Sequence, residues 1–131
     1  MKQVKSIQKK LNVQLDRITN PPTVTFGFRY LTEASWKDEK NVVFFKDFIR
    51  HLTLFSNLTW QGLYQSPRHG LGTEKIPLKS IKIQIQDIPN ELETLLALRA
   101  TGDNHSFLGF RRNDVFEIVC IETQFGDIYN H

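Results

Sequence analysis

The sequence predicts an α+β domain: an antiparallel meander sheet of four to five strands, with two or three helices packed on one face. Two observations lead to this class. Apolar residues recur every three or four positions in most of the first half of the chain, and every second position in much of the second half. The first spacing is typical of helices and the second of strands. Short turns join the later strands, which favours antiparallel pairing.

The bulk composition is that of one folded domain. The chain has 131 residues, of which 40% are hydrophobic and ten are phenylalanine. No apolar run approaches the ~18 residues of a membrane span, and the N-terminus lacks the apolar block of a secretory signal. We therefore expect a cytoplasmic protein with no membrane association. Its single cysteine, Cys120, lies in an apolar run and is expected to be a buried, inert thiol.

Residues 1–19 predict an amphipathic basic helix that precedes a single domain over 20–131. The apolar positions share one helix face and are Val4, Ile7, Leu11, Leu15 and Ile18. Lysine and amide side chains occupy the other faces. Pro21 and Pro22 end the helix, because proline lacks a backbone donor and disfavours helix in the residue before it.

The middle of the chain predicts one strand and two helices. Residues 23–31 alternate in strand fashion, and residues 39–57 return to helical spacing. The face expected to be buried in this helix consists of Val42, Phe45, Phe48 or Ile49, Leu52 and Phe55. A short helix over 60–65 follows, with Asn57 or Thr59 as its cap. We assign Trp36 and Trp60 to the core or its rim.

The remaining residues predict strands. The run "IKIQIQ" at 81–86 alternates strictly and is the clearest strand pattern in the chain. Residues 89–101 are interpreted as a short helical turn, which begins at "PNELE", followed by a strand. Residues 105–111 and 115–122 predict a hairpin, because Asn113 and Asp114 tolerate the positive φ of a tight turn.

The loop "YQSPRHGLGTEKIP" at 64–77 is one candidate functional segment. Arg68, His69 and Glu74 provide a phosphate-binding cation, a group that titrates near neutral pH and a carboxylate. Gly70 and Gly72 allow close approach of a substrate to the backbone. The alternative is an ordinary connecting loop, in which Glu74 pairs with Arg68 or caps a turn.

A second candidate cluster lies on the later strands and the tail "GDIYNH". We expect Arg99 and Arg111 to project from one face of neighbouring strands, and the tail to bring Tyr129 and His131 to them. The alternative is that both arginines are cross-strand charges and that Tyr129 is a packing anchor. Phosphate-binding glycine loops, a nucleophile elbow and a paired-cysteine zinc site are absent from the sequence, so we expect no cofactor and no metal.

Three segments carry a resemblance to known proteins: "FGFRYL", "LTWQGLYQSPRHGLGTEKI" and "FLGFRRNDVFEIVCIETQFGDIYNH". Over residues 20–131 the chain resembles a family of small proteins from bacteria and their mobile elements, which brings no activity with it. The chain departs from that family at Glu122 and Thr123, where relatives tend to carry an aspartate. Its helix-then-meander order, basic sheet and C-terminal Tyr/His are similar to RelE/ParE-type toxins. Those are small ribonucleases or gyrase poisons that a partner protein holds in check.

The resemblance and the residues together favour a toxin-like, metal-independent endoribonuclease of a toxin–antitoxin or phage-defence module. The net charge of the chain is +3. Clustered basic side chains would bind RNA, either free or within a ribosome. Arg68, Arg99 and Arg111 would hold the phosphate, and His69, or His131 with Tyr129, would move the proton. An antitoxin-like protein is the expected partner.

The alternative is a non-catalytic phage or mobile-element protein that inhibits a host protein through its first helix. A structural role in a mobile-element particle is disfavoured, because no repeat is visible.

Overall fold

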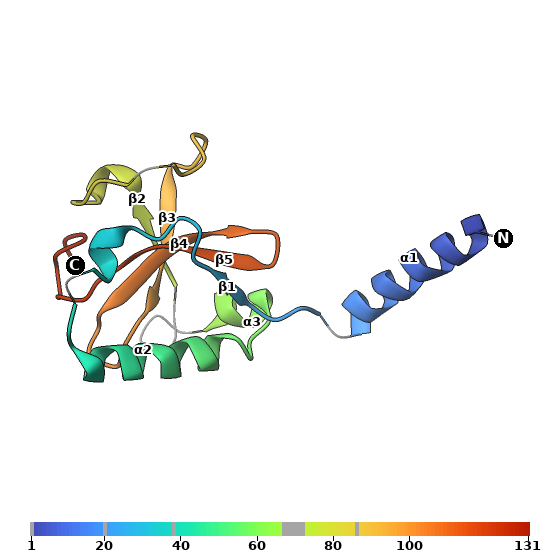
Figure 1. Ribbon diagram of the computed structural model, residues 1–131, viewed down its shortest axis with the longest axis horizontal. Coiled ribbons are helices and arrows are strands. Elements are labelled where there is room, and N and C mark those ends of the chain that lie inside the picture. Colours follow the sequence, from blue (N-terminus) through green and yellow to red (C-terminus); the bar gives the residue numbers. More distant parts are fainter. Residues whose placement is uncertain (1, 20, 38, 67–72, 86) are drawn as a thin grey trace.

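The protein is an α+β domain with a five-stranded sheet and a separate N-terminal helix (Figure 1). The structure, a computed structural model, describes residues 2–19, 21–37, 39–66, 73–85 and 87–131. The elements in chain order are α1 (Lys2–Thr19), β1 (Thr25–Gly27), η1 (Glu33–Ser35), α2 (Val42–Phe55), α3 (Trp60–Gln65), β2 (Glu74–Pro77), η2 (Leu78–Ser80), β3 (Thr94–Arg99), β4 (Ser106–Arg112) and β5 (Val115–Ile121).

The sheet has the strand order β1-β5-β4-β3-β2. Strands β2 to β5 form an antiparallel meander, in which a short turn joins β4 to β5 as predicted, whereas the longer segment 78–93 joins β2 to β3. The β4–β5 hairpin turns at Asn113, whose φ of 57° confirms the expected positive-φ turn. The prediction of a simple meander is wrong at one edge, where β1 pairs with β5 in parallel. That pairing is reached because α2 and α3 carry the chain away from β1 before the meander begins.

Helices α2 and α3 pack on one face of the sheet (Figure 1). Thr59 caps α3 by accepting a hydrogen bond from the Gly62 amide at 3.0 Å. The buried residues of α2 are Phe44, Phe48, His51 and Phe55. The predicted face of α2 is therefore partly wrong, since the side chains of Val42 and Ile49 are exposed. Two overlapping apolar stripes run along this helix, and helical spacing alone does not choose between them.

Irregular chain covers the opposite face of the sheet. Ile81, Ile83 and Ile85 are half-buried there and pack against a second apolar cluster around Leu108 and Cys120. The prediction of a strand over 81–86 is wrong, because the described residues of this segment join no strand ladder. Alternation reported correctly which side chains turn inward, but burial on one side does not require a hydrogen-bonded neighbour.

Three further sequence expectations need correction. Glu74 begins β2 and is not part of a loop. Residues 89–92 form a turn without a helix, closed by the Leu92 amide on the Pro89 carbonyl at 3.2 Å. Trp36 is exposed, whereas Trp60 is buried as expected.

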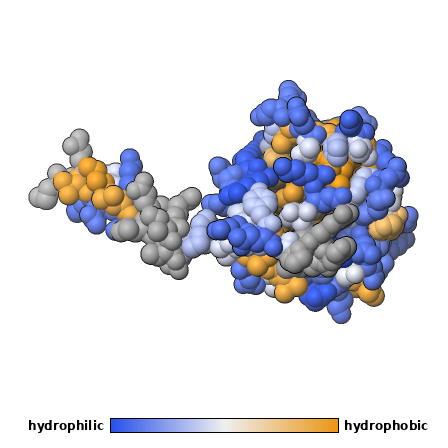
Figure 2. Space-filling view, turned by 180° about the vertical axis from the view of Figure 1, so that it is seen from behind, coloured by the Kyte–Doolittle hydropathy of each residue, from blue (hydrophilic) through white to orange (hydrophobic). Residues whose placement is uncertain are grey.

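Helix α1 stands apart from the domain (Figure 1). Its stripe residues Val4, Ile7 and Leu11 are 70%, 59% and 48% exposed. Figure 2 shows hydrophobic surface on this helix, separated from the body of the molecule. Lys2–Thr19 is thus helical, and the stripe residues that the structure describes on it do not pack on the sheet.

Candidate functional site

A polar cavity of about 300 Å³ opens where β3 ends and β4 begins. Thr73 and Glu74 at the start of β2 form one wall, and the C-terminal tail forms another. The lining residues with functional side chains are Thr73, Glu74, Arg99, Asn104, Ser106, Phe125, Tyr129 and His131. This cavity therefore brings together four residues that the sequence predicted for a site: Glu74, Arg99, Tyr129 and His131.

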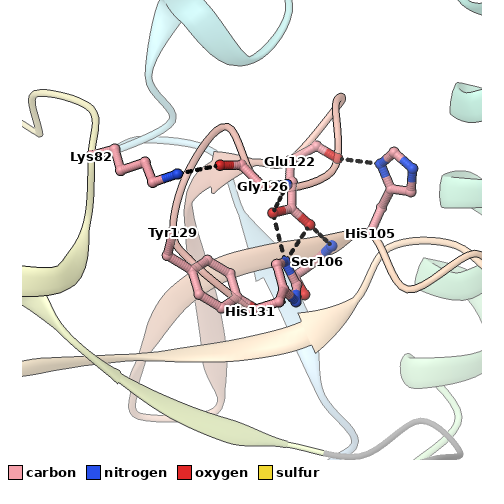
Figure 3. Close-up of polar contacts among 7 residues, drawn as sticks. All are labelled: Lys82, His105, Ser106, Glu122, Gly126, Tyr129 and His131. Carbon is pink, nitrogen blue, oxygen red and sulfur yellow. Dashed lines mark hydrogen bonds and ion pairs between the residues drawn. The ribbon is translucent and has the colours of Figure 1, made fainter.

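The core of the site is a carboxylate–histidine pair (Figure 3). His131 Nε2 lies 2.7 Å from Glu122 Oε2 and 3.0 Å from Oε1. The Glu122 side chain is fully buried and also accepts hydrogen bonds from the backbone amides of Ser106, at 3.1 Å, and Gly126, at 3.0 Å. When Glu122 is ionised, its carboxylate accepts a hydrogen bond from Nε2–H, so a neutral His131 has its lone pair on Nδ1. This is the arrangement by which a buried carboxylate orients a general base.

Aromatic stacking fixes the plane of the His131 ring. The ring lies between Phe125, at 4.1 Å between centroids, and Tyr129, at 4.3 Å. Tyr129 is 3% exposed, and its hydroxyl lies 3.0 Å from the Ser106 hydroxyl. Packing and hydrogen bonding thus hold Tyr129 in place, as the packing-anchor alternative describes. The histidine side chain keeps 23% of its surface exposed and is the more accessible proton-transfer group.

Arg99 supplies the positive charge of the cavity. It is the last residue of β3, and its guanidinium donates to Asn104 Oδ1 at 2.7 Å. Asn104 has a φ of 70°, which places its side chain in the tight turn between β3 and β4. Opposite, Glu74 pairs with Ala97 in the β2–β3 ladder. A cation, a carboxylate and an oriented imidazole therefore surround one space.

The structure does not bring Arg111 to this cavity. Arg99 pairs with Ser106, the first residue of β4, and Arg111 is the second-last residue of that strand. A strand rises ~3.3 Å per residue, so the two arginines lie roughly 16 Å apart along the sheet. The Arg111 guanidinium stacks on Trp60, 4.4 Å from the ring centroid, and its Nε donates to the Asn113 carbonyl. The expectation that Arg99 and Arg111 act together is therefore wrong.

Arg68 and His69 lie outside the described residues. The segment that carries them, 67–72, joins Ser66 after α3 to Thr73 at the cavity wall.

Burial raises the pKa of two titratable groups near the site, Asp127 and Cys120. Burial raises the pKa of Asp127, and the negative charge of Glu122 raises it further. Burial also raises the pKa of the Cys120 thiol to about 12, which confirms the expectation of a neutral thiol without nucleophilic character. Cys120 is thus a core residue of the sheet.

The sequence patterns did not predict Glu122 or Phe125 as site residues. Glu122 directly follows the apolar strand β5, and a glutamate at the end of a strand is usually solvated. Its neighbours in space come from positions 106 and 131, which no local spacing connects.

Comparison with known proteins does not identify the chain: it matches no family model, no curated protein and no solved structure. Among the described residues, no group of three His, Cys, Asp or Glu side chains is arranged to hold a metal ion. In the same part of the chain, no helix is both long enough and apolar enough to cross a membrane.

Proposed function

We propose that the protein is a toxin-like endoribonuclease that cleaves RNA with side chains alone, at the cavity between Arg99 and His131. The observation that carries the proposal is the Glu122–His131 pair, which presents an oriented imidazole to a cavity that also contains a guanidinium. General-base catalysis and electrostatic stabilisation of a phosphate are the two contributions that RNA transesterification needs.

The proposed reaction uses these positions. His131 Nδ1 takes the proton of a ribose 2′-hydroxyl, and the resulting oxygen attacks the adjacent phosphorus. Arg99 stabilises the charge that develops on the phosphoryl oxygens. The bond to the 5′-oxygen breaks, that oxygen takes a proton from solvent on the opposite side of phosphorus, and His131 releases its proton to solvent. The products are a 2′,3′-cyclic phosphate and a 5′-hydroxyl end.

Arg68 and His69 stay in the proposal as candidates for further phosphate contacts and proton transfer. Thr73 and Glu74 line the cavity, and they directly follow the segment that carries Arg68 and His69.

The test is cleavage of a defined single-stranded RNA in EDTA, with detection of cyclic phosphate ends. His131→Ala is expected to reduce the rate by about 10²–10⁴, the usual contribution of a general base. Arg99→Ala is expected to reduce it to a similar extent. Arg112→Ala is the matched control, because Arg112 is exposed at the other end of β4, where it contacts Tyr30.

Intact RNA with the wild-type protein would contradict the proposal, and so would full activity in folded His131→Ala protein. Arg68→Ala and His69→Ala belong in the same assay, since full cleavage by both variants would remove that loop from the mechanism. A toxin role further requires that expression arrests growth and that His131→Ala relieves the arrest.

A second candidate function rests on α1. Its stripe of Val4, Ile7 and Leu11 is exposed, and Lys5, Lys9 and Lys10 add positive charge around it. An exposed apolar stripe of this kind is typical of a helix that binds in the groove of another protein. Charge complementarity favours a groove with acidic edges, which suits either an inhibited host protein or an antitoxin.

Deletion of residues 1–19 tests this candidate. We expect the deletion to abolish capture of the partner protein while RNA cleavage is retained. The matched control is Val43→Ala, which alters an equally exposed apolar residue on α2. Capture that survives the deletion would rule out α1 as the docking element.

A further inference from the structure

An exposed aromatic ring stands at the rim of the cavity. Phe125 is 57% exposed, although it lies between the buried residues Glu122 and Ile128. It also lines the cavity with Arg99 and His131. The ring therefore offers an exposed aromatic surface beside the guanidinium and the imidazole of this cavity.

The ring is held in a fixed orientation. One face stacks on His131 with an interplanar angle of 24°, and His131 in turn stacks on Tyr129 at 29°. The following residue, Gly126, has a φ of 85° and donates its amide to Glu122 Oε2. The Asp127 amide closes the turn on the Gln124 carbonyl at 3.1 Å. The Phe125 ring is therefore the last parallel ring of a pre-formed stack, and the His105 ring lies against it in an edge-on arrangement, with 6.3 Å between centroids.

We infer that Phe125 is the stacking platform for an unpaired base of single-stranded RNA, a proposal that rests on the proposed ribonuclease function. A phosphate at Arg99 places the neighbouring base at the rim of the same cavity, where the Phe125 ring lies. Stacking on an aromatic ring is tolerant of base identity, because every base has a π face. Bases within a duplex are already stacked on both sides, so the substrate class is single-stranded RNA.

A purely structural role for Phe125 would be to shield the Glu122–His131 pair from water. The two roles differ in what they require of the side chain. Shielding requires apolar volume, which leucine provides, whereas stacking requires a flat π surface, which leucine lacks and tryptophan provides.

The test measures binding of a single-stranded RNA made non-cleavable by 2′-O-methylation, with 2-aminopurine as a stacking reporter. Phe125→Leu is expected to weaken binding about 10-fold and to lose the quenching of 2-aminopurine, while Phe125→Trp retains both. Phe28→Leu is the matched control, because Phe28 is 56% exposed and does not line the cavity.

Wild-type affinity in Phe125→Leu, or no RNA binding by the wild-type protein, would overturn the inference. The assay separates this inference from the proposed function. Binding that depends on Phe125 without any cleavage by the wild-type protein refutes the enzyme and supports the platform. Cleavage with an unchanged KM in Phe125→Leu refutes the platform and leaves the enzyme intact.

Discussion

Glu122 is the residue on which the candidate site depends. Its two carboxylate oxygens accept hydrogen bonds from two backbone amides as well as from the His131 ring. Each of these donors lies on a different segment, so one carboxylate ties together the start of β4, the tail turn and the proposed base. A fully buried acid is costly unless its oxygens are paired, and here both oxygens are.

Replacing Glu122 by glutamine keeps the size of the side chain and removes its charge, so it tests whether Glu122 orients the His131 ring or only fills space. The amide group must face one of the backbone donors, so we expect a loss of about 1–3 kcal/mol in unfolding free energy. The remaining amide oxygen is a weaker acceptor for His131 Nε2 than the carboxylate, so the tautomer is held less firmly, and RNA cleavage is expected to fall at least about 10-fold. The ¹⁵N chemical shifts of the His131 ring report the tautomer. Unchanged shifts and full activity in Glu122→Gln would contradict a positioning role.

At the scale of elements, the β4–β5 hairpin provides two interior strands of the sheet. The ladder between these strands shifts register at Leu108 and Gly109, which marks a bulge. An added Cβ at Gly109 would overlap the Glu117 carbonyl oxygen and lie 2.6 Å from a Phe116 ring carbon. Glycine is therefore required here by the close approach of β5.

The bulge yields a stability prediction. Gly109→Ala is expected to lower the unfolding free energy by about 1–3 kcal/mol through overpacking, measured by urea denaturation. Gly102→Ala is the matched control, because no atom lies within 4 Å of its added Cβ. That control is expected to stay within about 0.5 kcal/mol of wild type. Equal stability of the two variants would contradict the tight packing inferred at Gly109.

At the scale of the whole molecule, the protein divides into a compact sheet domain and the separate helix α1 (Figure 1). In the part of α1 whose side chains the structure describes, the stripe residues Val4, Ile7 and Leu11 are exposed and do not pack on the sheet. Deletion of residues 1–19 is therefore expected to leave the unfolding free energy of the domain within about 0.5 kcal/mol of wild type. A larger loss would show that α1 packs on the domain in solution, and it would weaken the docking proposal.

The class of fold was predictable from local patterns. The interactions behind helical spacing, the Thr59 cap and the Asn113 turn each span only a few residues. The neighbouring sequence is therefore enough to predict them. Burial was predictable even where the element was not: Ile81, Ile83 and Ile85 do turn inward, although 81–86 is no strand. Alternation reports only which side of an extended chain is covered.

The sequence by itself determined the α+β class, the antiparallel hairpins and several of the polar residues at the cavity. Tertiary structure alone decided the parallel pairing of β1, the removal of Arg111 to the far end of β4, and the meeting of Glu122 with His131. The physical reason is the range of the interactions. Spacing and capping act between near neighbours in sequence, whereas strand register and the pairing of a buried carboxylate are settled by chain segments that only folding brings together.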